Sequence, residues 1–139
     1  MDDVSFLSKV DLELKRAERY SVFVSLVVFD LTFVRDQFGP DAPGKVLRLF
    51  ESTRAKVREI DQVSVIDDYK LVLLLPETPR QGAEIAGRRV NELLRDMLSM
   101  EATETAERVI PMEMASYPDA AGARSIADFL RDYSHTHRN

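Results

Sequence analysis

Two oppositely charged residues, Arg58 and Asp61, stand three positions apart just before a predicted hairpin. An arginine fork donates paired hydrogen bonds and a carboxylate accepts them, so the two side chains could hold one edge of a ligand. The same spacing near a helix end also suits a local ion pair, which contributes about 0.3 kcal/mol when exposed. With 14 arginines and 13 aspartates, about one such Arg-x-x-Asp spacing is expected by chance. The motif alone therefore does not distinguish a ligand site from a local ion pair.

The hairpin covers Asp61–Pro76 and carries a polar tip at Asp67–Lys70. The apolar runs on both sides of the tip predict two strands that pass through a buried sheet. A further run, Val22–Asp30, is typical of a central strand buried on both faces and ends in a carboxylate. Asp30 and one aspartate of the tip offer too few oxygens for a hard cation, so the sequence predicts no metal site.

Helix and strand signals alternate along the chain and predict one layered α/β domain over 1–139 with a mixed sheet. The expected order is an N-terminal helix within 1–20, a strand at 22–30, a helix at 46–60, the hairpin at 61–76, a helix at 79–98, a strand at 108–117 and a helix at 125–133. The chain should break at Gly39–Gly44, and Thr78 should cap the helix that follows it. Pro111 should push its strand toward an edge of the sheet. A mobile acidic connection is expected at 99–107 and a frayed tail at 134–139.

Composition excludes several classes of site and partner. The chain has no cysteine, which rules out disulfides, thiolate metal sites and cysteine catalysis. A net charge of −5 gives no electrostatic reason to expect a nucleic acid or an anionic membrane as partner. The apolar runs are too short to span a bilayer and the charged N-terminus is not a signal peptide, so a cytoplasmic location is expected.

The order of elements and several short segments resemble the GGDEF family of diguanylate cyclases. Asp30 stands where that family has a metal-binding aspartate, residues 34–39 resemble its INDxYG segment, and Ala115–Asp119 resembles its ASYPxD segment. The spacing from Arg58 to Pro76 matches without a gap. The resemblance implies a nucleotidyl-cyclase-like fold, with a central mixed sheet flanked by helices.

The signature pentapeptide of the family falls on Asp67-Asp68-Tyr69-Lys70-Leu71. Two aspartates replace the glycines that let the backbone approach a triphosphate, Tyr69 replaces a metal-binding acid, and Lys70 reverses a charge. The asparagine that reads guanine in the family falls on Arg35. The resemblance therefore implies a degenerate domain that is not an enzyme, with no catalytic residue, no metal and no cofactor.

Arg58 and Asp61 match the RxxD inhibitory site of the family, which binds cyclic di-GMP, at the family's distance from the signature. The family completes this site with an arginine on the next helix, a role that falls on Arg88, with the adjacent Arg89 as a further possibility. The resemblance thus implies a cyclic di-GMP receptor that contacts guanine through these side chains. Because the family often binds this ligand as an intercalated dimer, a homodimer is also possible.

The alternative is a ligand-free protein-interaction or dimerisation domain in a bacterial signalling pathway. In either case a protein partner is expected, and the N-terminal helix would be the natural attachment point for an upstream sensory domain.

Overall fold

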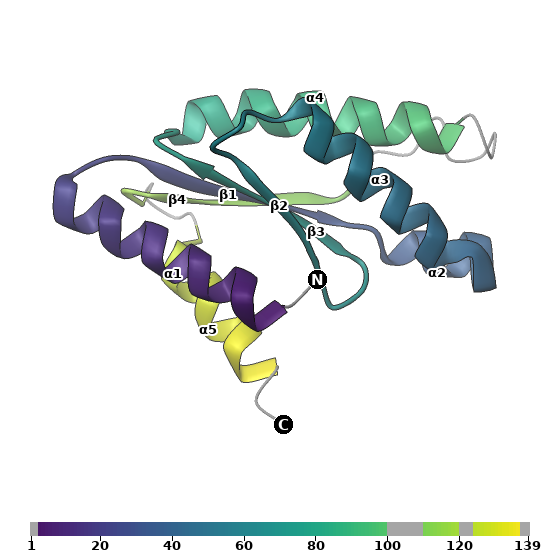
Figure 1. The fold of residues 1–139 in the computed structure, drawn as a ribbon, viewed down its shortest axis with the longest axis horizontal. Coiled ribbons are helices and arrows are strands. Elements are labelled where there is room, and N and C mark those ends of the chain that lie inside the picture. The colour runs from purple at the N-terminus through teal and green to yellow at the C-terminus, as the bar shows by residue number, and fades with distance from the viewer. Residues whose placement is uncertain (1–2, 100–109, 120–123, 137–139) are drawn as a thin grey trace.

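The computed structural model describes residues 3–99, 110–119 and 124–136, which form helices on both faces of one sheet (Figure 1). The elements are α1 (Asp3–Tyr20), β1 (Val24–Asp30), α2 (Thr32–Phe38), the 3-10 turn η1 (Gly39–Asp41), α3 (Ala42–Lys56), β2 (Gln62–Ile66), β3 (Lys70–Pro76), α4 (Arg80–Ser99), β4 (Met112–Tyr117) and α5 (Ile126–Thr136). The predicted hairpin is confirmed as β2 and β3.

The four strands lie in the order β2-β3-β1-β4, and every neighbouring pair is antiparallel. The layered α/β prediction is confirmed, but the described strands do not form a mixed sheet. The physical reason is the position of β3 between β1 and β2. The strands β1 and β2, which α2 and α3 connect, run in the same direction but are not neighbours, so they do not pair. This arrangement sets Asp30 at the end of β1 directly opposite Lys70 at the start of β3.

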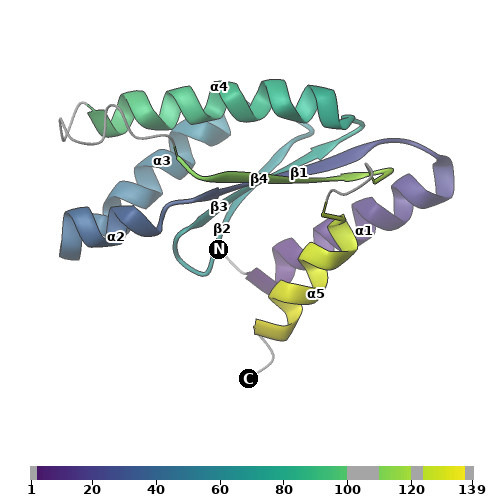
Figure 2. The ribbon, with the colours of Figure 1, turned by 180° about the vertical axis from the view of Figure 1, so that it is seen from behind.

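The sheet separates two helical layers, with α3 and α4 on one face and α1 and α5 on the other (Figures 1 and 2). Side chains alternate along β1, so Val27 and Phe29 enter the core under α3 and α4, while Leu26 and Val28 enter the core against α1 and α5. Both central strands are therefore buried on both faces, as their continuous apolar runs predict.

Two helical segments differ from the sequence prediction. Thr32–Phe38 forms the short helix α2, which was not expected because seven residues make fewer than two turns and show no clear hydrophobic period. Helix α3 begins at Ala42, before the predicted start at 46, and carries Pro43 in its first turn. A proline there loses no helical hydrogen bond because the first amides of a helix have no partner within it, so the expected chain break becomes a helix start.

The chain ends also require corrections. Helix α5 continues to Thr136, so the expected frayed tail at 134–139 is helical in its first half, and residues 137–139 lie outside the described residues. The expected acidic connection at 99–107 lies outside them too, apart from Ser99 at the end of α4. Strand β4 lies at an edge of the sheet, as Pro111 indicated.

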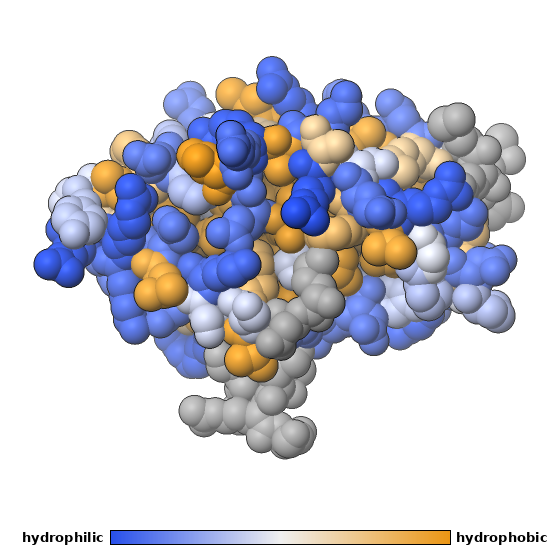
Figure 3. Space-filling model, viewed as in Figure 1, coloured by the Kyte–Doolittle hydropathy of each residue, from blue (hydrophilic) through white to orange (hydrophobic). Residues whose placement is uncertain are grey.

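The surface seen in Figure 3 is mainly hydrophilic, with hydrophobic groups in separate places. Large hydrophobic side chains that are exposed anywhere in the described residues are Val4, Leu12, Tyr20, Phe23, Leu47, Ile60 and Ile85. Among the described helices, none combines the length and the hydropathy required to cross a membrane.

Candidate functional site

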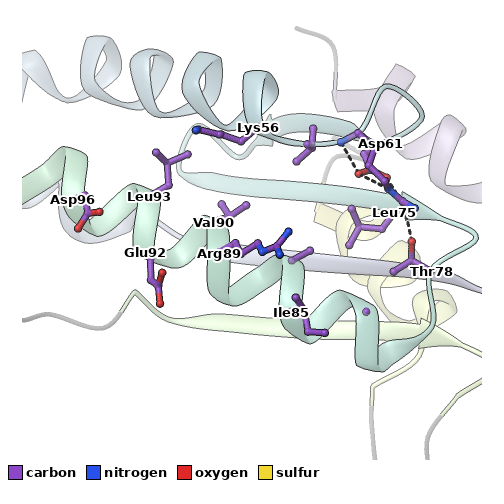
Figure 4. A pocket seen from close by; sticks show the side chains of 14 residues that line it. Lys56, Asp61, Leu75, Thr78, Ile85, Arg89, Val90, Glu92, Leu93 and Asp96 are labelled. Carbon is purple, nitrogen blue, oxygen red and sulfur yellow. Dashed lines mark hydrogen bonds and ion pairs between the residues drawn. The ribbon is translucent and has the colours of Figure 1, made fainter.

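A cavity of about 620 Å³ lies between α4 and the hairpin, near the end of α3 (Figure 4). Arg58 and Asp61 border it from the segment between α3 and β2, Thr78 from the loop after β3, and Arg89 from α4. Its apolar lining comes from Val57, Leu75, Ile85, Ala86, Val90 and Leu93. The fold thus brings two of the three predicted ligand residues to one cavity.

The third predicted residue, Arg88, does not line this cavity, whereas the alternative Arg89 does. Consecutive residues of a helix point about 100° apart, so the two arginines of α4 face different surroundings. Arg89 shares its side of the helix with Ala86 and Leu93, and Figure 4 shows its side chain extending from α4 toward the cluster around Asp61 and Thr78. Arg88 is exposed outside the cavity.

Arg58 and Asp61 form a closed pair. The guanidinium donates from Nε to both carboxylate oxygens at 3.2 and 3.1 Å and from Nη2 to Oδ1 at 2.8 Å. The backbone N–H of Arg58 also donates to Oδ2 at 3.0 Å, and the N–H of Asp61 donates to the carbonyl of Arg58 at 3.0 Å. The side chain of Asp61 is only 5% exposed, while that of Arg58 is 53% exposed, so the arginine covers the carboxylate.

The loop after β3 holds the other side of Arg58. Nη2 donates to the Thr78 hydroxyl at 2.6 Å and to the carbonyl of Pro76 at 3.1 Å. The Thr78 hydroxyl donates to the carbonyl of Pro76 at 2.9 Å and accepts from Arg58, and α4 begins only at Arg80, so the expected role of Thr78 as a helix cap is wrong. The hydrogen bond to Asp61 raises the pKa of Arg58 above its usual value, against the opposing effect of burial, so the guanidinium stays charged.

Thr78 and Pro76 were missed as partners of Arg58 by the sequence reasoning. Nothing local to Arg58 indicates them, because they contact it across 20 and 18 positions of the chain. The only available signal was the ungapped segment from Arg58 to Pro76, which fixes the length of the hairpin that brings the loop back.

The signature region lies at the opposite end of the hairpin, where Lys70 forms an ion pair with Asp30 at 2.8 Å. Thr32 donates to the same carboxylate from its backbone N–H at 2.9 Å and its hydroxyl at 2.6 Å. Burial raises the pKa of Asp30, but the hydrogen bonds from Lys70 and Thr32 outweigh it and hold the pKa below the usual value. An ammonium group therefore neutralises this carboxylate.

The hairpin tip has a left-handed backbone. Asp67 and Asp68 have φ values of +51° and +63°, a region that favours glycine and is tolerated by aspartate. The tip is anchored to the start of α2 because Leu31 N–H donates to the carbonyl of Tyr69 at 2.8 Å. The guanidinium of Arg35 lies 5.8 Å from the centre of the Tyr69 ring, which is a cation–π distance.

No cluster of three or more His, Cys, Asp or Glu side chains within the described ranges is placed to hold a metal ion.

No protein-family model matches the sequence, and no curated protein does. The fold, however, is similar to several solved structures. The GGDEF domain of YfiN (TpbB) from Pseudomonas aeruginosa superposes with a TM-score of 0.62 at 18% identity, covering 96% of this chain and 84% of that domain. The active GGEEF domain of a diguanylate cyclase from Vibrio cholerae gives 0.61 at 17% identity, with coverages of 93% and 83%.

A third similar structure is the diguanylate cyclase SiaD in complex with its activator SiaC, also from Pseudomonas aeruginosa. Its TM-score is 0.61 at 20% identity, and the match covers 96% of this chain but 54% of SiaD. Three matches across nearly the whole chain confirm the predicted fold. The chain has the fold of the GGDEF domains of diguanylate cyclases.

Proposed function

We propose that this chain is a catalytically inactive GGDEF-like domain that binds cyclic di-GMP in the cavity beside Arg58 and Arg89. The observation that carries the proposal is that two arginines from separate segments border one cavity of about 620 Å³. Small-molecule sites in proteins typically enclose about 300–1,000 Å³, with an apolar lining and a few polar groups. Arginine forks bind phosphate oxygens and purine edges, both of which a cyclic dinucleotide presents.

The surroundings of Asp30 support the absence of cyclase activity. Phosphoryl transfer from a nucleoside triphosphate needs metal ions that neutralise the phosphates, and Asp30 is already paired with the Lys70 ammonium. The carboxylates of Asp67 and Asp68 would add negative charge at the tip, where a triphosphate already carries several charges. Incubation with GTP and Mg²⁺ is therefore expected to release no pyrophosphate above background. Release at the rate of an active GGEEF domain assayed in parallel would overturn this half of the proposal.

The binding half is tested by titration calorimetry with cyclic di-GMP, using Arg89→Ala and Arg88→Ala as a matched pair. The two variants remove the same side chain from adjacent positions of α4, but only Arg89 borders the cavity. Loss of a charge-assisted contact worth about 1.5–3 kcal/mol should weaken binding roughly 10- to 100-fold in Arg89→Ala. Arg88→Ala should bind as the wild type does. Equal affinity of both variants would argue against this cavity.

A second candidate is a ligand-free interaction domain, and one observation favours it. Arg58 already binds Asp61, Pro76 and Thr78 within the chain, so much of its donor capacity is used without a ligand. SiaD, a similar structure, was solved with a protein activator. An absence of heat at several hundred micromolar cyclic di-GMP, with a folded sample, would favour this candidate.

A further inference from the structure

The donor atoms of Arg58 are unequally available. An arginine side chain has five N–H groups, and a bidentate contact to guanine needs two of them on one edge. Nε and Nη2 form one edge, and both donate to Asp61. Nη2 also donates to Pro76 and Thr78. Nη1 donates to no acceptor in the described part of the chain, so Arg58 has this nitrogen, and not a complete edge, to offer to a ligand.

The acceptor atoms of Asp61 are similarly committed. Oδ1 accepts from Nε and Nη2 of Arg58, and Oδ2 accepts from Nε and from the backbone N–H of Arg58. With 5% of its side chain exposed, Asp61 presents almost no surface to a base in the cavity. A carboxylate must accept from N1–H and the exocyclic amine to recognise guanine, and this carboxylate is covered by its own arginine.

We infer that Asp61 is a positioning residue that holds Arg58, and that the cavity binds cyclic dinucleotides through phosphate oxygens with little preference for guanine over adenine. This inference rests on the proposed binding function and concerns its selectivity. Nη1 of Arg58 and the guanidinium of Arg89 supply charged donors that suit single phosphate oxygens. Neither contact distinguishes one purine from another.

The rest of the cavity fits this division of roles. Ile85, Ala86 and Leu93 offer an apolar surface on which either purine can lie, because every base has a π-face. The acidic side chains that line the cavity from α4, Glu92 and Asp96, lie further along that helix than Arg89. Lys56 also lines the cavity, from the end of α3, so the phosphates should sit among Arg58, Arg89 and Lys56.

The inference is tested by calorimetric titration of the wild type with cyclic di-GMP and with cyclic di-AMP under the same salt conditions. The dissociation constants are expected to agree within about threefold. Bidentate recognition of guanine contributes about 1–3 kcal/mol of discrimination, which corresponds to roughly 5- to 150-fold. A tenfold or greater preference for cyclic di-GMP would mean that the ion pair between Arg58 and Asp61 breaks and that Asp61 then hydrogen-bonds to guanine. That result would overturn the inference.

Asp61→Asn separates positioning from base recognition. If Asp61 holds Arg58, the variant should weaken both dinucleotides by a similar factor, and the ratio of their dissociation constants should stay unchanged. If Asp61 reads guanine, the variant should lose affinity for cyclic di-GMP alone. A second readout is the NMR signal of the Arg58 Nε–H, which should shift in Asp61→Asn before any ligand is added because Nε donates to that carboxylate.

The failure of this inference differs from the failure of the proposed function. Strong binding of cyclic di-GMP with weak binding of cyclic di-AMP contradicts the inference alone. Absence of binding by both dinucleotides contradicts the inference and the receptor function together. Similar affinities for the two dinucleotides, lowered by the same factor in Arg89→Ala, support the inference and the receptor function.

Discussion

The ion pair between Arg58 and Asp61 should stabilise the fold far more than an exposed pair at the same spacing. Arg58→Ala removes the side chain that covers the Asp61 carboxylate, which is 5% exposed in the wild type, and leaves a backbone N–H as its partner. Hydrogen bonds to charged groups contribute about 1.5–3 kcal/mol each, and breaking a fully buried pair costs about 3–5 kcal/mol. Because Arg58 is half exposed, we expect a loss of about 2 kcal/mol in the free energy of unfolding.

The partner substitution should cost less. Asp61→Asn keeps the shape of the side chain and leaves behind an arginine that reaches water, so we expect a loss of about 1 kcal/mol. The double variant has no buried charge. Its loss in the free energy of unfolding should therefore be smaller than the sum of the two single losses by about 1–1.5 kcal/mol. Urea unfolding of the wild type, the two single variants and the double variant measures this coupling energy, provided that the slope of the unfolding free energy against urea concentration is the same in all four.

A matched control is the pair of Glu13 and Arg16 on α1, which has the same spacing but a 3.7 Å separation and side chains that are 26% and 45% exposed. Its coupling energy should lie within about 0.5 kcal/mol of zero. A coupling energy below about 0.5 kcal/mol for Arg58 and Asp61 would refute the reasoning. The pair would then be an ordinary surface interaction.

Three further predictions follow from the hairpin tip, the end of β1 and helix α5. Asp67→Gly and Asp68→Gly should each raise the free energy of unfolding by about 0.5–1 kcal/mol, because glycine adopts positive φ without strain. Asp30→Asn should destabilise the protein at pH 7, and the difference should vanish as the pH falls below about 4, because the lowered pKa stabilises the fold only while the carboxylate is ionised. Burial raises the pKa of Tyr133 to about 12, so its contribution to stability is complete below about pH 10 and declines as the pH rises toward 12.

Each of these has a control or a direct readout. Asp36→Gly places the same change in helix α2, where it should cost about 0.5–1 kcal/mol, and a gain there would disqualify the reasoning about the tip. Thermal unfolding of Asp30→Asn at pH 7 and pH 3 checks the second prediction, and an equal deficit at both values would contradict it. Absorbance at 295 nm should show one late tyrosine titration that disappears in Tyr133→Phe; its persistence would assign the transition elsewhere.

Sequence patterns located the elements that bury apolar surface. The runs at Val24–Asp30 and on both sides of the hairpin tip have the length and the Val, Ile and Leu content of strands, so these strands could be predicted. The strand pairing could not, because the run that forms β4 does not indicate which edge of the sheet it joins. Helix α2 has only seven residues, fewer than two turns, so its hydrophobic period is too short to recognise although Val34 and Phe38 both pack in the core.

The candidate site was predictable in part for similar reasons. The spacing of Arg58 and Asp61 indicated contact, but Arg58 is also held by Pro76 and Thr78, which only the folded hairpin brings close. Arg88 and Arg89 could not be distinguished by sequence, because the choice depends on which flank of α4 faces α3. The pairing of Asp30 with Lys70 depends on the register between β1 and β3.

The layer that covers the second face of the sheet has a consequence for biosynthesis. It combines Phe6 and Val10 of α1 with Ile126 and Phe129 of α5, so its two halves leave the ribosome far apart in time. The hairpin, α3 and α4 are complete before α5 is made, whereas α1 must wait for its partner. During translation the apolar face of β1 and β3 therefore stays half covered until α5 has emerged. A released chain that ends before Ile126 should bind hydrophobic-surface probes and chaperones, whereas the chain that includes α5 should not.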